Sequence, residues 1–415
     1  MANSTNYYIK KIFRDSPLSF SFSKSLINQV LDEDRLKKAL YDAHKDVPFY
    51  SSYSMPDDIK DLSSLPILRK SVIVGHEKDF ISRKVPNWMI RQLETGGTSG
   101  VSLRVYYRPH EVLRYNSVAN YAFSMIGNHL RIAELRGHRP ADNKISEKMG
   151  PVLLLSSYLL NEETLDDYLN ELREHKITCL HVYPSSLAIL CRLIRQKYGE
   201  ADLPLLKGIL ASSEVFSHED KNLAKQAFPS VKIVDFYGLN ELCCAAVSVD
   251  DGPFRFFQNY GYVEMIDTGE RIGDHKIAEI VATSIMNRTM PLIRYGTEDY
   301  AEIDENGEVV AILGRTSDFV VTKHKRLIPC IFINRDISFA HVVTFQYFQE
   351  REGELIFRVM VNDGFGKADI DNLMEDLQNS FIDVDSKVEV VGEMDKTRIG
   401  KQRRMVQKLD LNKYK

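Results

Sequence analysis

Residues 152–182 read VLLLSSYLLNEETLDDYLNELREHKITCLHV, and this stretch indicates the fold class of the chain. Residues 152–156 form a short apolar run, which is typical of a buried strand. Residues 162–175 carry apolar side chains at the spacing of an amphipathic helix, and residues 178–183 form a second apolar run. The stretch therefore predicts a strand, a helix and a strand in succession. Such alternation implies an α/β fold with a largely parallel sheet.

The same alternation continues toward the C-terminus, and then the pattern changes. A helix is predicted over 185–197, and further strands over 206–211 and 232–236. The chain then becomes β-rich, with short strands predicted over 261–266, 277–283, 300–303 and 309–313. Beyond residue 318 the pattern predicts strands over 342–348, 355–361 and 387–391 and a helix over 367–381. We therefore predict a large N-terminal domain over 1–317, with mostly parallel sheets and a β-rich subdomain, and a small α+β domain over 318–415.

Length, charge and cysteine usage exclude several classes of protein. The chain has 415 residues, too many for one average domain, because single cores usually stop growing beyond roughly 250 to 300 residues. A formal net charge of -4 gives no basis for nucleic-acid binding. No apolar run approaches the roughly 20 residues of a membrane span, and the N-terminus lacks the apolar stretch of a signal peptide. The five cysteines form no CxxC pair and are expected to be mostly buried hydrophobes in a reducing compartment, so we expect a cytoplasmic protein.

A loop rich in glycine and hydroxyl groups is the first segment with chemical meaning. It consists of Thr95, Gly96, Gly97, Thr98, Ser99 and Gly100. Glycine lets backbone N–H groups approach phosphate oxygens and the hydroxyls add donors, so a loop of this kind suits a triphosphate. It is neither a Walker A loop nor a dinucleotide fingerprint. Taken alone, it fits a flexible surface turn better than a phosphate loop.

Four further segments place charged or aromatic side chains where they can hold a nucleotide. They are 235–241 (DFYGLNE), 294–299 (RYGTED), 314–318 (GRTSD) and Gly400–Lys401. The first follows a predicted strand, at the edge where open parallel sheets bind ligands, so an aromatic ring can stack there and Glu241 can hold Mg2+. Asp299 can accept hydrogen bonds from ribose hydroxyls, Arg315 can meet ribose or phosphate, and Lys401 can reach an α-phosphate. Individually, each segment also fits a solvated turn, a surface ion pair or a basic face.

In kind and in order, the five segments resemble those of the adenylate-forming superfamily of acyl-CoA ligases, adenylation domains and luciferases. They resemble in particular the phenylacetate-CoA ligase branch and, within it, the CapK-type proteins of capsule and surface-polysaccharide loci. Further matching segments are 46–50 (DVPFY), 65–70 (LPILRK), 155–158 (LSSY), 183–186 (YPSS) and 290–295 (MPLIRY). The resemblance covers nearly the whole chain. It implies adenylation of a carboxylic acid with ATP and Mg2+, followed by acyl transfer to an acceptor.

The resemblance also implies a role for each matching residue. The loop at 95–100 would wrap the β- and γ-phosphates. The residues expected around the rest of the nucleotide are Ser213 and Glu214 beside the adenine, Asp235 at the adenine amino group, Tyr237, Gly238 and Asn240 along the nucleotide, and Asp299 and Arg315 at the ribose. Glu241 would bind Mg2+, Asp318 would be a hinge, and Lys401 on a mobile small domain would be the adenylation lysine.

Several departures from the family pattern bear on the loops and on the acceptor. The phosphate loop continues as VSLR where relatives usually carry proline, so Arg104 is expected to supply charge there. Glu298 stands where glycine is usual, which is expected to alter the local turn. His324 stands where relatives place a glycine that lines the pantetheine tunnel, so CoA and an amine stay alternative acceptors. The two cysteines after Glu241 have no histidine close behind them, and no zinc is expected.

We therefore expect an adenylate-forming ligase whose partners are a small-molecule carboxylate and a thiol or amine acceptor. A protein that kept the fold and nucleotide binding but lost turnover is the second interpretation, against which Glu241, Asp299 and Lys401 all argue. The acid itself stays open, as does the oligomeric state, for which a homodimer is one alternative. Candidates for the acyl pocket are Tyr158, His181, Tyr183 and Phe236, although aromatic side chains at strand ends more often belong to the core.

Overall fold

Strands and helices alternate through the middle of the chain, as the apolar runs predict. In the computed structural model they belong to two compact units. Unit 1 comprises Met1–Met125 and Val234–Ile312, and unit 2 comprises Ile126–Ile233 and Leu313–Lys415. The structure describes residues 30–56, 58–95, 103–138, 140, 144–315, 319–329, 341–381, 383–395 and 403–414.

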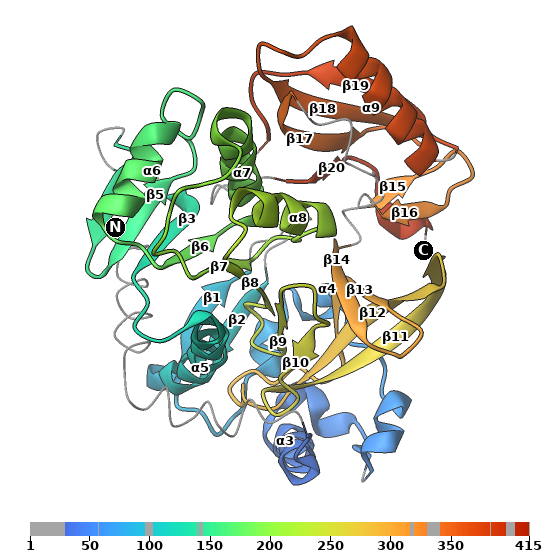
Figure 1. Ribbon diagram of the computed structural model, residues 1–415. Helices are drawn as coiled ribbons and strands as arrows, with labels where there is room; N and C mark the ends of the chain where they lie inside the picture. The colour runs from blue at the N-terminus through green and yellow to red at the C-terminus, as the bar shows by residue number, and fades with distance from the viewer. Residues whose placement is uncertain are drawn as a thin grey trace. The chain divides into compact units, whose positions relative to one another are not determined.

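Unit 2 contains neighbouring strands in the order β7-β6-β3-β5-β4. They are β3 (Ile132–His138), β4 (Ser146–Met149), β5 (Val152–Ser156), β6 (Cys179–Val182) and β7 (Gly208–Ser212). β3 is parallel to β5 and to β6, and β6 is parallel to β7, whereas β4 is antiparallel to β5. The helices between the strands are α6 (Leu165–Glu174), α7 (Pro184–Tyr198) and α8 (His218–Ala227) (Figure 1). The predicted α/β class and its parallel sheet are confirmed.

The local sequence explains where two of these helices begin and end. α7 has Pro184 in its first turn, where the missing N–H costs no hydrogen bond, and ends at Gly199 with a φ of 81°. α8 follows Ser217, whose hydroxyl accepts a hydrogen bond from the N–H of Asp220. Because α7 starts two residues after β6 ends, the carboxyl end of β6 lies beside a helix N-terminus.

The parallel strands β3, β5, β6 and β7 have one face that packs into an apolar core. Its side chains share a buried cluster with residues of α6, α7 and α8, and include Ala133, Leu135, Leu180, Val182, Ile209 and Ala211. Successive residues of a strand point to opposite faces, so Glu134, His181 and Leu210, which are partners in register, lie on the other face. The core of unit 2 therefore accounts for one face of these strands only.

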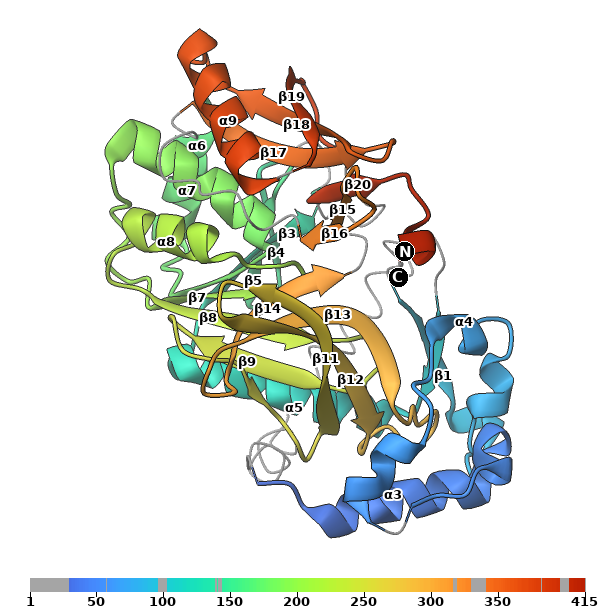
Figure 2. The same ribbon diagram turned by 90° about the vertical axis from the view of Figure 1, so that its right-hand side faces the viewer.

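The C-terminal part of unit 2 forms a second sheet covered by a helix. Its strands are β17 (Val342–Gln349), β18 (Glu354–Val361), β19 (Asp385–Val390) and β20 (Met405–Gln407), in the order β19-β18-β17-β20, and β15 (Phe319–Val321) and β16 (Leu327–Pro329) form a short hairpin. α9 (Lys367–Ser380) lies along this sheet (Figure 2), where Leu373 and Leu377 pack in one cluster with Phe345 and Phe357. The predicted small α+β segment is present. Asp318, the predicted domain boundary, lies outside the described residues, so the boundary stays a prediction.

Buried charges join this C-terminal segment to α7 and α8 within unit 2. Asp220 of α8 pairs with Arg404, which precedes β20, and lies 3.8 Å from Arg192 of α7. Arg192 also donates to the carbonyl of Val343 at 2.9 Å. Both guanidinium groups lie over the ring of Phe345, at 4.8 and 5.9 Å from its centroid. The side chain of Asp220 is 1% exposed, so its charge depends on these arginines.

Unit 1 is richer in antiparallel strands. β8 (Lys232–Gly238), whose residues from Val234 on belong to unit 1, pairs with β9 (Ala245–Val249), and β9 pairs with β10 (Arg255–Phe256). A second sheet has the order β11-β12-β13-β14, with β11 (Gly261–Ile272), β12 (His275–Ser284), β13 (Tyr295–Ile303) and β14 (Val309–Arg315). The predicted β-rich segment is confirmed, although its strands are longer than the apolar runs that predict them.

The N-terminal part of unit 1 consists of short elements that pack onto this sheet. Its α-helices and strands are α3 (Glu33–Asp46), α4 (Lys70–Ile73), β1 (Arg91–Glu94), β2 (Arg104–Tyr107) and α5 (Pro109–Ile126). The hydroxyl of Tyr50 accepts from the N–H of Ile293 at 3.0 Å and donates to the carbonyl of Pro291 at 3.2 Å. Leu68 donates its N–H to the carbonyl of Arg294 at 2.8 Å. Segments 46–50, 65–70 and 290–295, which match the family far apart in the sequence, thus meet in unit 1.

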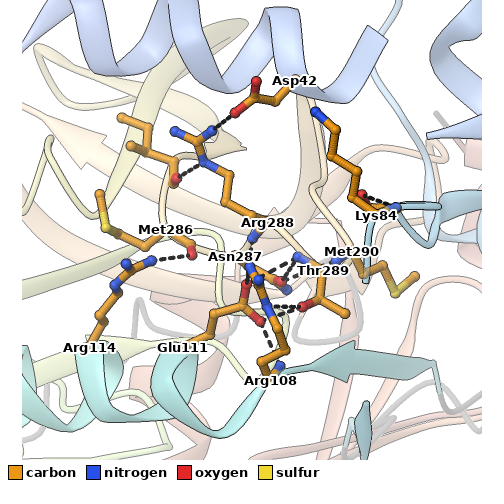
Figure 3. A network of polar contacts seen from close by, with 12 residues as sticks. Asp42, Lys84, Arg108, Glu111, Arg114, Met286, Asn287, Arg288, Thr289 and Met290 are labelled. Carbon is orange, nitrogen blue, oxygen red and sulfur yellow. Dashed lines mark hydrogen bonds and ion pairs between the residues drawn. The ribbon is translucent and has the colours of Figure 1, made fainter. Parts of the chain in front are cut away.

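A buried carboxylate, that of Glu111, fixes the start of α5 to the loop between β12 and β13 (Figure 3). It accepts hydrogen bonds from the N–H and guanidinium of Arg108, from the N–H of Arg288, and from the N–H and hydroxyl of Thr289. A cavity of about 210 Å³ near this network is lined by charged side chains that are paired with one another, among them Asp42 with Arg288 and Asp46 with Lys84. These groups stabilise unit 1 and belong to none of the predicted nucleotide segments.

Candidate active site

The predicted magnesium ligand, Glu241, is a buried carboxylate of unit 1. It follows β8 in the chain and is 4% exposed. The hydroxyl of Tyr295, the first residue of β13, donates to its Oε1 at 3.2 Å. This bond orients one carboxylate of the kind that Mg2+ uses together with phosphate oxygens, so the residue present fits the ion. Across the described residues, no group of three or more His, Cys, Asp or Glu side chains could hold a metal ion by itself.

The half-buried Tyr237 and the buried Asp299 form a second pair in unit 1. The hydroxyl of Tyr237 donates to Oδ2 of Asp299 at 2.8 Å, and the N–H of Asp299 donates to Oγ1 of Thr297 at 3.0 Å. Burial of Tyr237, together with the adjacent Asp299 carboxylate, raises the pKa of the phenol well above its usual value. The neutral phenol is therefore a lasting donor to the carboxylate, which it holds in one orientation.

The structure corrects two local expectations at these residues. The sequence around Asp299 predicts a charged turn, but the residue lies within β13, and its burial argues against the alternative of a solvated turn. β8 extends to Gly238, two residues beyond the predicted end at 236, so Tyr237 lies inside the strand instead of after it. The pairing of β12 with β13 shifts register between Glu279 and Val281, opposite the segment that contains Glu298 and Asp299. This irregular pairing lets a turn-like sequence lie within a strand. Glu298 adopts a φ of 62° beside this irregularity, a conformation that suits the glycine usual in the family.

The remaining residues of this segment differ in exposure. Asp235 is buried in β8, whereas Asn240 is exposed. A Cβ on Gly238 would be tightly packed, 3.1 Å from the hydroxyl of Tyr115 and 3.2 Å from the ring of Phe236, so a side chain there would require these aromatic side chains to shift slightly.

The phosphate-loop segment is described at its two ends. Thr95 follows β1 and is buried; its N–H donates to the carbonyl of Leu103 at 2.9 Å, and its Oγ1 accepts from the N–H of Leu103 at 3.0 Å. Arg104 lies opposite Glu94 in the register of the antiparallel strands β1 and β2, and it is exposed. The residues Gly96, Gly97, Thr98, Ser99 and Gly100 lie outside the described residues, as do Asp318 and Lys401. The hairpin therefore gives the loop a fixed base, while the roles of these residues stay predictions.

The predicted adenine residues follow β7 in unit 2. Ser213 has a φ of 74°, a strained conformation for a residue with a side chain, and strain of this kind often marks functional sites. Its hydroxyl accepts from Nη2 of Arg136 at 2.9 Å. Glu214 accepts through Oε2 from the N–H of Ser185, in the first turn of α7, at 3.0 Å. Arg315 is the last residue of β14 and is half-buried.

A hydrogen-bonded chain beside Ser213 contains two residues that motif reasoning missed. Nδ1 of His181 lies 3.2 Å from Oε1 of Glu134, and its Nε2 lies 3.2 Å from Oγ of Ser212. His181 was a candidate for the acyl pocket, but Glu134 and Ser212 were not. Their sequence signal is weak: Glu134 is a lone acid in the run IAELRGH, and Ser212 is one small residue beside another. Only the pairing of β3, β6 and β7 brings the three together.

Comparison with known proteins finds relatives of low sequence identity. No family model matches it. Phenylacetate-coenzyme A ligase of Pseudomonas putida is 23% identical over 329 residues, which are 71% of this chain and 72% of that protein. Protein CapK of Staphylococcus aureus is 21% identical over 349 residues, 77% of this chain and 73% of that protein. The chain is thus similar to proteins of the phenylacetate-CoA ligase branch of the adenylate-forming superfamily.

Solved structures of adenylate-forming ligases share the fold of this chain. 2-Hydroxyisobutyryl-CoA ligase in complex with 2-HIB-AMP superposes with a TM-score of 0.66 at 16% identity, covering 90% of this chain and 88% of that protein. An amide bond synthetase from Marinactinospora thermotolerans gives a TM-score of 0.51 at 17% identity, covering 74% and 66%. In the part of the chain that the structure describes, no helix is both long enough and apolar enough to span a bilayer.

Proposed function

We propose that this chain uses ATP and Mg2+ to convert a carboxylic acid into an acyl-adenylate and pyrophosphate, and then transfers the acyl group to CoA or to an amine. The observation that carries the proposal is the pair of buried, oriented carboxylates in unit 1. Glu241 is held by Tyr295, and Asp299 is held by Tyr237. Buried carboxylates are costly unless they have partners or ligands, and here both occur at residues that match the family's nucleotide motifs.

Each group has a chemical task in the proposed reaction. Mg2+ bound by Glu241 and the ATP phosphates would neutralise charge on the pyrophosphate that leaves. Asp299 accepts hydrogen bonds from ribose hydroxyls, and Tyr237 keeps that carboxylate in place. Arg315 adds a cation beside ribose or phosphate. Lys401 stabilises the negative charge that develops on the α-phosphate when the carboxylate attacks it. Ser213 and Glu214 border the adenine, and Asp318 provides the hinge for the small domain.

The acceptor divides the proposal into two branches. Relatives named phenylacetate-coenzyme A ligase support CoA, and the amide bond synthetase among the structural neighbours supports an amine. His324 lies in the turn between β15 and β16, where its ring pairs with Asp383 at 3.0 Å and its side chain is 67% exposed. The resemblance to CapK-type proteins supports a role in surface-polysaccharide modification. Use of ATP and the free thiols of Cys179, Cys191, Cys243 and Cys244 favour the cytoplasm.

The test is release of pyrophosphate from ATP and Mg2+ across a panel of aryl, aliphatic, hydroxy and amino acids, with no acceptor added. A carboxylate-dependent signal is expected in the wild type. Lys401→Ala is expected to reduce the rate by roughly 100- to 1000-fold, because it removes one charge from the developing transition state, while ATP binding persists. ATP binding without turnover on any acid would favour a nucleotide-binding protein that has lost catalysis. An unchanged rate in Lys401→Ala would exclude the role assigned to this lysine.

A further inference from the structure

We propose that the acid adenylated by this protein carries a hydroxyl group on its acyl part, and that Glu134, His181 and Ser212 recognise that hydroxyl. The inference rests on the proposed adenylation function and adds the class of substrate to it. None of the three residues belongs to the five nucleotide segments.

The three side chains form a directed hydrogen-bonded chain. An ionised carboxylate can only accept hydrogen bonds, so Nδ1 of His181 carries the proton that it shares with Glu134 at 3.2 Å. When the ring is neutral, its Nε2 accepts from the hydroxyl of Ser212, which lies 3.2 Å away. His181 is 9% exposed and Ser212 is 6% exposed. Burying three polar groups costs free energy unless each forms hydrogen bonds. The opposite face of these strands packs apolar side chains instead.

The hydrogen-bonded group of Glu134, His181 and Ser212 lies toward the ends of parallel strands, where such sheets bind ligands. Glu134 and His181 are register partners on β3 and β6, and Ser212 is the last residue of β7. Open α/β sheets bind their ligands at the carboxyl ends of the strands. Packing alone favours apolar residues at such positions, and the neighbouring register partners Leu154 and Leu210 are apolar. The polar residues are therefore confined to one part of this face.

The hydrogen-bonded group also adjoins the residues proposed to border the adenine. Ser212 directly precedes Ser213, whose hydroxyl accepts from Arg136 at 2.9 Å. The guanidinium of Arg136 lies 4.8 Å from the centroid of the Tyr183 ring. In an acyl-adenylate the acyl group is bonded to the phosphate of the same nucleotide. Groups next to the adenine-bordering residues are therefore suitably placed to contact the acyl part.

The chemistry of these groups selects a hydroxyl over charged or apolar alternatives. Ser212 directs its hydrogen at His181 and keeps oxygen lone pairs that can accept a hydrogen bond. Nε of Arg136 is a buried donor without a hydrogen-bond partner among the described residues. A hydroxyl donates to the first and accepts from the second. Because Arg136 and the carboxylates of Glu134 and Glu214 carry opposite charges, any ionic acyl group would meet a like charge as well as an opposite one, whereas a neutral hydroxyl meets no such repulsion.

The experiment measures selectivity within matched pairs of acids. Pyrophosphate release by the full chain is followed with several hydroxy acids, each beside its deoxy counterpart, such as 3-hydroxybutyrate with butyrate and 4-hydroxyphenylacetate with phenylacetate. In the wild type, kcat/KM is expected to favour the hydroxy member of at least one pair by roughly 10- to 100-fold, because a site built for a hydroxyl discriminates against its absence. Ser212→Ala and His181→Phe should bring this ratio toward one while activity on the deoxy acid persists. His181→Gln, which keeps the hydrogen bonds, should retain most of the preference.

A matched control exists on β3, the strand that carries Glu134. His138, at the end of β3, pairs with Glu147 at 3.1 Å in a more exposed setting, and His138→Phe should leave the ratio unchanged. A purely structural role for the chain would lower the melting temperature of Ser212→Ala and His181→Phe without changing the ratio. That result, or a wild type that prefers the deoxy member of every pair, overturns the inference and leaves adenylation standing. Absence of carboxylate-dependent pyrophosphate release with every acid, despite ATP binding, overturns the proposed function and the inference with it.

Discussion

Replacing Glu111 by glutamine should destabilise unit 1 by about 3 kcal/mol. The carboxylate of Glu111 is 1% exposed and accepts five hydrogen bonds, two of them from Arg108. Oε2 accepts from the N–H of Arg108 at 2.6 Å and from the hydroxyl of Thr289 at 2.7 Å. Oε1 accepts from Nη2 of Arg108 and the N–H of Arg288, both at 2.9 Å, and from the N–H of Thr289 at 3.1 Å.

The magnitude follows from what an amide can offer these donors. Glutamine keeps one acceptor oxygen and turns an NH2 group toward the donors of the other, so at least two hydrogen bonds are lost in either orientation. Hydrogen bonds to a charged group contribute roughly 1.5–3 kcal/mol each, although the Thr289 hydroxyl can rotate to accept from the amide and recover part of this. Arg108 is also left without its buried counter-charge. Together these losses give about 3 kcal/mol, within the range of roughly 3–5 kcal/mol for breaking a buried ion pair.

Thermal and urea unfolding of the full chain measure this effect. For a unit of this size, 1 kcal/mol shifts the midpoint by roughly 2–4 °C, so Glu111→Gln should melt roughly 6–12 °C below the wild type. The control is Glu308→Gln in the same unit, since Glu308 pairs with Arg255 at the surface at 2.9 Å and should contribute under about 1 kcal/mol. A midpoint for Glu111→Gln within about 1 °C of the wild type would refute the reasoning, because the network would then add nothing beyond packing.

Three further changes test individual contacts. Tyr237→Phe removes the hydrogen bond to a buried carboxylate and should cost roughly 1.5–3 kcal/mol in urea unfolding, with weaker ATP binding by calorimetry; an unchanged ATP affinity would separate this residue from the nucleotide. Arg404→Met leaves Asp220 with one arginine 3.8 Å away and should cost roughly 3–5 kcal/mol, part of which Asp220→Asn should restore in the double variant; additive losses would contradict the pairing. A hydrogen bond from the N–H of Gly366, and a second one from His341, lower the pKa of Asp369. This carboxylate therefore stabilises the fold above its unfolded pKa of about 3.9. The contribution is lost as the pH falls through the lower folded pKa. Asp369→Asn should flatten that acid limb in a pH series of melting temperatures, and an identical limb would exclude the effect.

The sequence predicts the parallel core well because its signals are local. The apolar run at 152–156, the helical spacing after it and the next apolar run correspond to β5, α6 and β6. Glycine and proline punctuation also has a local cause, as at Pro184 and Gly199 around α7. Signals of this kind depend on residues a few positions apart. They survive without knowledge of which elements become neighbours.

Features that depend on pairing between distant segments could not be predicted in the same way. The acidic sequence around Asp299 reads as a turn, and only the irregular pairing of β12 and β13 turns it into a buried strand position. Glu111 is an ordinary acid at a helix start until Arg288 and Thr289, more than 170 positions away, place their donors around it. The site residues of the five motifs could be named from resemblance alone. The residues beside them could not, because no motif contains them.

The two faces of the unit 2 strands therefore carry different information about the protein. The face toward α6, α7 and α8 needs only apolar side chains of suitable size, which explains how proteins of 16% identity can share the fold. The opposite face carries Glu134 and His181, joined by a hydrogen bond to Ser212 at the end of β7. Changes on the first face should alter stability, and changes on the second should alter the choice of acid. In the proposed reaction the nucleotide motifs carry the adenylation step, so we expect the choice of acid to come from residues outside those motifs. In unit 2 our candidates for this choice are the polar residues that the apolar core leaves unexplained.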